Sequence, residues 1–245
     1  MPSFEAEAER KLIVALDMPD AGEAYDFWQR LALPGAVAKI GLELLMAGGA
    51  DLVRKLAASG VPVFVDAKLF DIANTVERAT ARVADLGAAF LTVHAQDRQT
   101  VEAAVRGRTG SNLKLLGITL LTNAKANDLA AQGVTLSIGD LVLRRASLAA
   151  DAGFDGVVSS PLEARDLKGR FGERLAVVCP GIRPAAQEVS GDDQARTATP
   201  GEALRHGADY IVAGRPVTGA SDPGAAARAI IAEMAEALRN AGGGQ

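Results

Sequence analysis

The sequence contains very little cysteine and no excess of basic residues. Cys179 is the only cysteine among 245 residues, so no internal disulfide can form, and no group of Cys and His residues has zinc-site spacing. The formal net charge of −4 disfavours a general nucleic-acid or membrane-surface binder, because both need a basic face. A few local cations could still hold one small anionic ligand.

Long apolar runs are also absent. No run approaches the ~18 residues of a membrane-spanning helix. Residues 1–11 are acidic and polar, without the apolar core of a signal peptide, so we expect a cytoplasmic protein with no membrane partner. Neither a G-x-G-x-x-G after a predicted strand nor a G-x-x-x-x-G-K-[ST] occurs, which disfavours an open doubly wound sheet.

Short runs rich in β-branched residues alternate with Ala-rich amphipathic stretches, at roughly 25–40 residues per unit. Their continuous apolar character is typical of parallel strands covered on both faces. Eight such runs with helices between them predict an α/β fold, a (β/α)₈ TIM barrel. We expect one domain over residues 1–245, with a short N-terminal helical extension and a flexible C-terminal tail from Gly242. The expected strands are Leu12–Asp17, Val37–Gly41, Val61–Lys68, Phe90–His94, Leu113–Leu121, Gly156–Ser160, Leu175–Cys179 and Tyr210–Ala213.

Two further segments carry local signals. After the third strand, Asn74 and Glu77 have the spacing of a capping box, and Gly87 ends the helix that follows. Residues 181–200, after the seventh strand, are polar and rich in Gly, Pro and Asp. Loops of this length in compact domains are usually functional or disordered.

Four charged residues lie in or at the ends of the first three strands, and the carboxyl ends of barrel strands host active sites. Asp66 and Lys68 are two residues apart and should share a face, with Lys39 and Asp17 close enough to pair with them. Any one of these residues alone is more simply part of a structural ion-pair network. The four together favour a site preorganised to stabilise charge, since buried charges are costly to retain.

The segment from Asp66 to Val76 reads D-A-K-L-F-D-I-A-N-T-V, and it resembles the orotidine 5′-phosphate decarboxylase signature D-x-K-L-x-D-I-x-N-T-V, in particular that of the bacterial type 1 enzymes. The usual His of the signature is Phe70 and the usual Pro is Ala73, so we expect local packing changes rather than lost chemistry. Weaker blocks follow in family order at Val14–Asp17, Lys39–Gly41, Thr92–His94, Leu120–Thr122, Pro180–Pro184, Asp193–Pro200 and Val212–Arg215.

The resemblance implies decarboxylation of orotidine 5′-phosphate to uridine 5′-phosphate, with no cofactor and no metal. Lys68 is the implied proton donor to a C6 carbanion, and Asp66 would lie near the departing carboxylate. Lys39 would hold Asp66 and contact the ribose, and Asp17 would bind a ribose hydroxyl.

The resemblance also implies a homodimer with shared active sites. Asp71 would act in the site of the partner subunit, together with Ile72 and Thr75. The other implied substrate-binding residues are Gly214, Arg215, Arg183 and Gln194 for the phosphate, Thr122 for the pyrimidine edge, and Pro180. The loop that carries Arg183 and Gln194 is expected to close on the substrate.

Three alternatives remain open. A metal-dependent sugar-phosphate decarboxylase or aldolase of the same superfamily shares the D-x-K-x-x-D core, but its second-strand position tends to be acidic, whereas Lys39 would repel a cation. A non-catalytic nucleotide-binding barrel would bind uridine 5′-phosphate without turnover. Another phosphate-binding barrel would have no use for the Asp/Lys array. His94 and His206 are too far apart for a convincing metal site, and we expect both to be structural.

Overall fold

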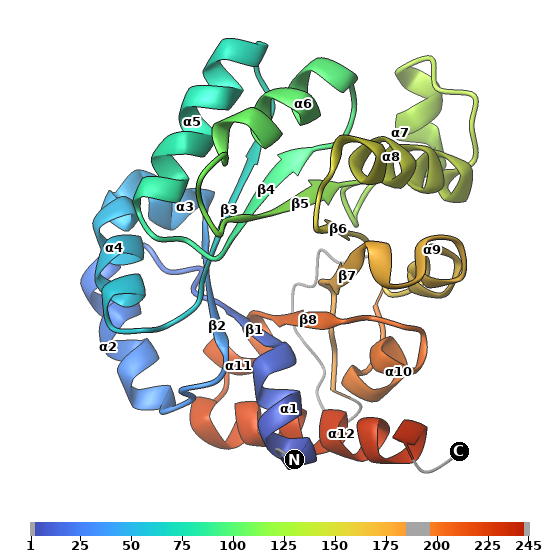
Figure 1. Ribbon diagram of the computed structural model, residues 1–245. Helices are drawn as coiled ribbons and strands as arrows, with labels where there is room; N and C mark the ends of the chain where they lie inside the picture. Colours follow the sequence, from blue (N-terminus) through green and yellow to red (C-terminus); the bar gives the residue numbers. More distant parts are fainter. Residues whose placement is uncertain (1–2, 185–196, 243–245) are drawn as a thin grey trace.

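The chain forms a closed barrel of eight parallel strands in the computed structural model, which describes residues 3–184 and 197–242. The strands follow one another in sequence order around the barrel, and β8 pairs with β1 to close it. Helices surround the ring of strands (Figure 1). The predicted (β/α)₈ TIM barrel is therefore confirmed.

The strands are β1 (Leu12–Ala15), β2 (Val37–Gly41), β3 (Val63–Leu69), β4 (Phe90–His94), β5 (Lys114–Ile118), β6 (Gly156–Val158), β7 (Ala176–Cys179) and β8 (Tyr210–Ala213). The helices are α1 (Phe4–Lys11), α2 (Ala21–Leu31), α3 (Leu42–Leu44), η1 (Leu45–Gly49), α4 (Ala50–Ala58), α5 (Ala73–Asp85), α6 (Arg98–Gly107), α7 (Ala126–Ala131), α8 (Ile138–Ala152), α9 (Ala164–Phe171), η2 (Gly172–Arg174), α10 (Pro200–Arg205), α11 (Arg215–Thr218) and α12 (Pro223–Gly242).

Several boundaries differ from the sequence-based expectations. β1 ends at Ala15, so Asp17 lies just beyond the strand rather than within it. β5 ends at Ile118, three residues before the predicted end. Gly242 still belongs to α12, and the rest of the expected tail lies outside the described residues. Among the residues that the structure describes, no helix is long and apolar enough to cross a bilayer.

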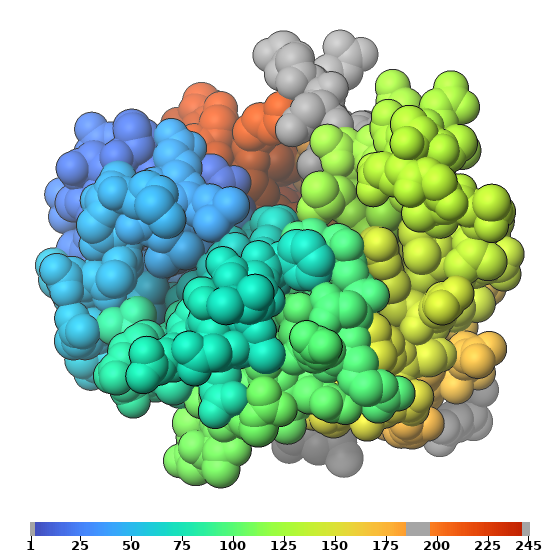
Figure 2. All heavy atoms as spheres, turned by 90° about the horizontal axis from the view of Figure 1, so that it is seen from above, coloured from blue at the N-terminus to red at the C-terminus, as the bar shows by residue number. Residues whose placement is uncertain are grey.

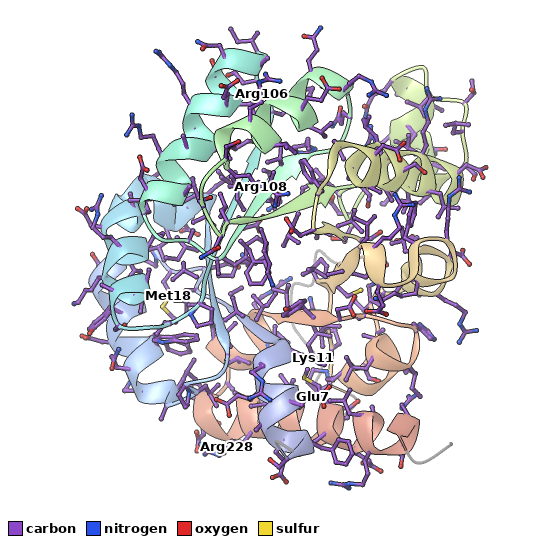
Figure 3. All side chains as sticks on the ribbon, viewed as in Figure 1. Glu7, Lys11, Met18, Arg106, Arg108 and Arg228 are labelled. Atoms are coloured by element: carbon purple, nitrogen blue, oxygen red, sulfur yellow. The ribbon has the colours of Figure 1, made fainter. Side chains whose placement is uncertain are left out.

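Alternation along the strands divides the core into two layers. Val63 and Val65 belong to the layer between strands and helices, whereas Phe64 points into the barrel. The rings of Phe64 and Phe90 meet edge to face at 6.1 Å, and Phe90 meets Tyr210 at 5.5 Å. Outside the barrel α5 and α6 lie side by side (Figure 2). Side chains fill the ring of strands (Figure 3), with Ile13, Phe64, Leu116 and Val178 buried there, so the barrel is a packed core.

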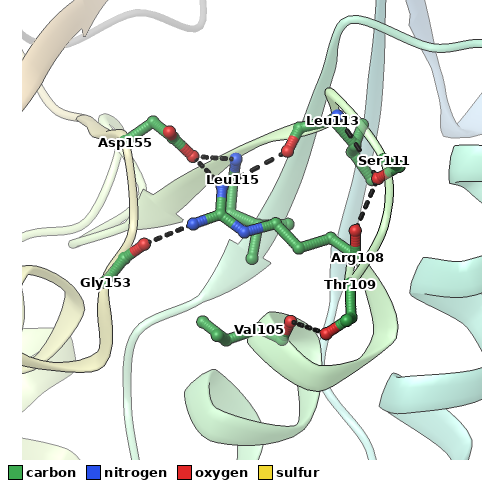
Figure 4. A network of polar contacts seen from close by, with 8 residues as sticks. All are labelled: Val105, Arg108, Thr109, Ser111, Leu113, Leu115, Gly153 and Asp155. Carbon is green, nitrogen blue, oxygen red and sulfur yellow. Dashed lines mark hydrogen bonds and ion pairs between the residues drawn. The ribbon is translucent and has the colours of Figure 1, made fainter.

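At the amino-terminal end of the barrel, Arg108 joins two neighbouring units. Its guanidinium pairs with Asp155, which precedes β6, and donates to the carbonyl oxygens of Leu113 and Gly153 (Figure 4). Asp155 also accepts the backbone N–H of Leu115 in β5 at 2.8 Å. One arginine therefore satisfies polar groups of both units at the end away from the charged array.

The same arrangement recurs two units later. Asp209, which precedes β8, accepts the backbone N–H of Val177 at 2.7 Å and pairs with Lys168 at 2.9 Å. In both places an aspartate just before an even-numbered strand satisfies a backbone donor of the preceding odd-numbered strand, and a cation balances its charge.

The start of α5 differs from the prediction. The N-cap position is Ile72, which makes no side-chain hydrogen bond, and Asn74 lies inside the helix. The capping box predicted from Asn74 and Glu77 is therefore wrong. Glu77 instead pairs with Arg106 of α6, with 2.8 Å between Oε2 and Nε.

Ala73→Pro is expected to stabilise the protein. Ala73 is the first residue of α5, where proline is favoured because no intrahelical hydrogen bond is lost. Ile72 already has the extended conformation that a following proline requires, with ψ of 149°. Reduced freedom of the unfolded chain should raise the free energy of unfolding by about 0.4–1 kcal/mol, measured by urea denaturation.

The matched control is Ala81→Pro in the interior of the same helix. It should lower the free energy of unfolding by about 3 kcal/mol or more, because it removes a helical hydrogen bond. A loss of stability in Ala73→Pro would contradict the expectation that a proline fits at the first residue of α5.

Candidate active site

Four charged side chains meet at the carboxyl ends of β1, β2 and β3. Lys39 Nζ lies 3.3 Å from Asp17 Oδ1 and 3.4 Å from Asp66 Oδ2. Lys68 Nζ lies 2.8 Å from the same Asp66 oxygen. The order of contacts, Asp17–Lys39–Asp66–Lys68, alternates in sign as expected from the sequence.

Asp66 is the buried centre of this array. Burial alone raises the pKa of its carboxyl, but Lys39, Lys68 and hydrogen bonds from Lys68 and Thr92 outweigh burial and hold the pKa below its ordinary value. Asp66 is therefore ionised at neutral pH. Lys39 is also buried, whereas Asp17 is exposed. Burial of a carboxylate or of an ammonium group would destabilise the fold if the opposite charge were not beside it.

The close approach of Asp17 and Lys39 depends on a glycine. A Cβ added at Gly41 would lie 3.2 Å from Asp17 Oδ1 and 3.4 Å from Lys39 Nζ. Any larger residue at this position would crowd both charged groups, so Gly41 leaves the space in which they pair.

β3 departs from regular strand geometry at Asp66 and Lys68, the two members of the array that it carries. Val65 pairs with Leu91 and Leu69 with Val93, so three residues of β3 face one residue of β4. Lys68 has φ of 47°, in the left-handed region, which costs a non-glycine residue about 1–3 kcal/mol. The expectation that Asp66 and Lys68 meet is correct, but regular alternation of a strand is not the reason, because the strand is bulged between them.

Thr92 is a site residue for which the sequence indicates no role. Its Oγ1 accepts the backbone N–H of Lys68 at 2.9 Å and donates to Asp66 Oδ1 at 2.9 Å. Thr92 is completely buried and lies on β4 opposite the bulge. Thr92 could have been found from the sequence, because it lies two residues after Phe90 on the same strand and so should also face the barrel interior. It also belongs to a block, Thr92–His94, that resembles the family.

The array forms one wall of a cavity of about 460 Å³ at the carboxyl ends of the strands. This volume lies within the usual range for small-molecule sites. Apolar side chains line its floor and sides, among them Phe64, Ile118, Val158 and Val212. The remaining lining residues that the sequence singled out are Thr122, Pro180, Arg183, Gly214 and Arg215.

The two arginines come from the segments after β7 and β8, and β8 pairs with β1, the strand that leads into Asp17. Arg215 follows β8, and Arg183 follows β7. Ile182 and Ala198 form a β-bridge and Arg183 N donates to Ala198 O at 2.9 Å, which ties the two ends of the loop after β7 together. Gln194, expected to contact the phosphate, lies in residues 185–196, outside the described part of the chain.

Asp71, Ile72 and Thr75 do not line this cavity. All three are exposed, with Ile72 at 73%, and Asp71 Oδ1 accepts the N–H of Ile72 at 2.6 Å. The neighbouring Phe70 packs edge to face against His94, with 5.8 Å between ring centroids. Phe70 thus forms an aromatic contact between the β3–α5 loop and the end of β4.

His94 lies beside the site without joining the array. Burial, then Arg145 and Lys68, lower the pKa of its imidazole, against a smaller opposing effect of Asp66. The ring is therefore neutral at neutral pH, and its Nδ1 lies 3.2 Å from Gln96 Nε2. Within residues 3–184 and 197–242, no group of three or more His, Cys, Asp and Glu residues has the arrangement of a metal site.

Comparison with known proteins gives consistent matches. The model of the family described as "Orotidine 5′-phosphate decarboxylase / HUMPS family" matches residues 10–230. Orotidine 5′-phosphate decarboxylase of Rhodopseudomonas palustris is 50% identical over 228 residues, 93% of this chain and 96% of that protein. The Methylorubrum extorquens protein of the same name is 48% identical over 232 residues, 95% of this chain and 98% of that protein.

A solved structure agrees with these matches. The crystal structure of orotidine 5′-phosphate decarboxylase from Lactobacillus acidophilus superimposes with a TM-score of 0.80 and 37% identity. The superposition covers 91% of this chain and 98% of that one.

Proposed function

Because the chain belongs to the orotidine 5′-phosphate decarboxylase / HUMPS family, we propose that it converts orotidine 5′-phosphate to uridine 5′-phosphate in pyrimidine biosynthesis, without a cofactor. The observation that carries this proposal is the alternating array of Asp17, Lys39, Asp66 and Lys68 in the wall of the cavity. Arg183 and Arg215 in the lining of the same cavity supply the cations that a phosphate monoester needs.

The reaction breaks the bond between C6 of the pyrimidine and the carboxyl carbon, and the electron pair stays on C6. The ammonium of Lys68 stabilises this carbanion as it forms and then donates a proton to C6. Asp66, kept ionised by Lys39 and Lys68, opposes the negative carboxylate of the substrate, and that repulsion disappears as CO₂ leaves. Electrostatic stabilisation of developing charge is usually the largest single contribution to catalysis, and Lys68 supplies it here.

The rest of the cavity positions the nucleotide. Asp17 and Lys39 bind the ribose hydroxyls, and Thr122 hydrogen-bonds the pyrimidine edge. Arg183 and Arg215 bind the phosphate, with Gly214, Pro180 and Gln194 completing the expected set. Binding energy from the phosphate and ribose, which do not react, holds the base against Lys68.

The contacts of Lys39 disfavour the metal-dependent alternative. Its ammonium lies within 3.4 Å of carboxylate oxygens of both Asp17 and Asp66. A divalent ion held by these two carboxylates would meet a fixed positive charge at the same place. The carboxylates are therefore matched to an ammonium group rather than to a metal ion.

The proposed active form is a homodimer with shared sites, in which Asp71, Ile72 and Thr75 complete the cavity of the partner. Exposed apolar side chains after β2 and β3 support this arrangement: Met46 is 82% exposed, Ile72 73% and Phe70 56%. Leu42 and Leu121, at the cavity mouth, are also exposed. Burial of this surface by a second copy would remove a cluster of apolar groups from water.

A single domain over residues 1–245 and a cytoplasmic location stay predictions.

The direct test follows the loss of orotidine 5′-phosphate absorbance in buffer with EDTA. Rapid loss, with uridine 5′-phosphate as the product, is the expected result. Activity that appears only with added magnesium, or only with keto-sugar phosphates, would instead favour the metal-dependent alternative. Tight binding of uridine 5′-phosphate with no turnover under any of these conditions would favour a non-catalytic barrel.

A further inference from the structure

Thr92 occupies an unusual place in the barrel, because it lies opposite the bulge that separates Asp66 from Lys68. At the bulge the backbone of β3 leaves the regular ladder with β4, and the N–H of Lys68 meets the hydroxyl oxygen of Thr92 at 2.9 Å. The hydroxyl of Thr92 thus takes the place of a backbone carbonyl of β4 as the acceptor for the N–H of Lys68. A valine, which has nearly the same shape, would leave this N–H without its acceptor.

The same hydroxyl has a second partner. Its hydrogen is donated to Asp66 Oδ1 at 2.9 Å, while the two lysines contact Oδ2 of that carboxylate. One oxygen of Asp66 is therefore held by a neutral group and the other by cations. The hydroxyl connects the backbone of Lys68 to the side chain of Asp66. Its contact with Asp66 is buried, and its contact with Lys68 is partly buried.

We propose that Thr92 is a positioning residue for catalysis, which holds Lys68 in its left-handed conformation and fixes the orientation of the Asp66 carboxylate. The proposal rests on the proposed decarboxylation for its kinetic consequences. A strained backbone conformation persists only where surrounding contacts hold it in place. At Lys68 one of these contacts is the hydrogen bond to Thr92, which a single substitution removes. Small displacements of reacting groups are enough to lower turnover strongly.

Thr92→Val tests the proposal, with Thr92→Ser as the conservative variant that keeps a hydroxyl. For Thr92→Val we expect kcat to fall about tenfold or more, with KM changed by less than about threefold, because the phosphate and ribose contacts remain. Thr92→Ser should retain turnover within about threefold of the unsubstituted enzyme. The acid limb of the kcat/KM profile should move to higher pH in Thr92→Val, because a hydrogen bond that lowers the pKa of Asp66 is lost.

Thr80→Val provides the matched control for loss of a buried threonine hydroxyl. Thr80 lies in α5 and is completely buried, and its Oγ1 has no hydrogen-bond partner within the described residues. This variant should leave kcat, KM and the pH profile unchanged. A purely structural effect of Thr92 would instead appear as lower stability with unchanged kcat, and that result would overturn the proposal.

A crystal structure of Thr92→Val tests the positioning role of Thr92 independently of whether the protein is a decarboxylase. If the unsubstituted protein is inactive, the decarboxylase assignment fails, but the positioning role is still tested by the coordinates. We expect Lys68 to leave positive φ, or its ammonium to move away from Asp66. An unchanged Lys68 backbone and an unchanged Asp66–Lys68 contact would refute the positioning role whatever the activity.

Discussion

Lys68→Ala is expected to abolish measurable turnover of orotidine 5′-phosphate while uridine 5′-phosphate still binds. The substitution removes the proposed proton donor and the charge nearest to Asp66, at 2.8 Å. Proton transfer by a positioned side chain contributes about 10²–10⁴-fold, and loss of electrostatic stabilisation adds to this, so turnover should fall by at least about 10⁴-fold. Absorbance assays at high enzyme concentration measure the loss, and calorimetry with uridine 5′-phosphate measures binding.

Arg215→Ala provides the contrasting variant. Arg215 lines the same cavity but follows β8, whereas Lys68 belongs to β3. Its loss should weaken the binding of uridine 5′-phosphate and leave the weaker binding of uridine almost unchanged, because the guanidinium acts on the phosphate. Near-normal turnover by Lys68→Ala would refute the assigned proton donor. Equal losses of uridine and uridine 5′-phosphate affinity in Arg215→Ala would argue against a phosphate contact.

The barrel and its charged array were predictable because both depend on short-range patterns. Apolar runs of strand length, separated by amphipathic stretches, are sufficient to place eight strands. The carboxyl ends of parallel strands meet at one end of a barrel, so Asp66 and Lys39 had to be neighbours once β2 and β3 were identified. Topology places the two strands side by side, and the register, in which Lys39 lies opposite Phe64, sets the 3.4 Å contact between Lys39 and Asp66.

Thr92 was not predictable because its role depends on a local irregularity. Two-residue periodicity treats residues 66–68 as ordinary strand, and nothing in the letters Asp-Ala-Lys indicates φ of 47° at the lysine. Once the bulge exists, the residue opposite it faces both a free N–H and a carboxylate. That information lies in the register of β3 against β4, which the sequence of neither strand contains.

The start of α5 shows the opposite failure, in which a local signal was outweighed by a tertiary contact. Asn74 and Glu77 match the spacing of a capping box, but the helix starts before Asn74. Glu77 points instead to Arg106 on the neighbouring α6, 29 residues away along the chain. The Glu77 carboxylate could bind the backbone at the start of α5 or the side chain of Arg106, and the packing of α5 against α6 brings Arg106 close. A local sequence motif contains no information about that packing.

Asp71→Ala and Lys68→Ala should each be nearly inactive alone, and their mixture should recover activity. Asp71 is exposed and does not line the cavity of its own chain, whereas Lys68 does. In a hybrid dimer, one site would combine an intact Lys68 from one chain with an intact Asp71 from the other. Random exchange of equal amounts should make about one quarter of all sites complete, since half the dimers are hybrids with one good site each. Turnover after verified subunit exchange measures this recovery.

The matched control mixes Lys68→Ala with Asp66→Ala. Asp66 and Lys68 belong to the same wall of one cavity and touch each other within one chain. Every site of that hybrid lacks one of the two, so exchange should restore no activity. Recovery in the first mixture and none in the control can arise only if Asp71 acts across the interface. An active Asp71→Ala variant, or no recovery after verified exchange, would leave the exposed apolar groups beside the site as a contact surface that contributes nothing to the chemistry.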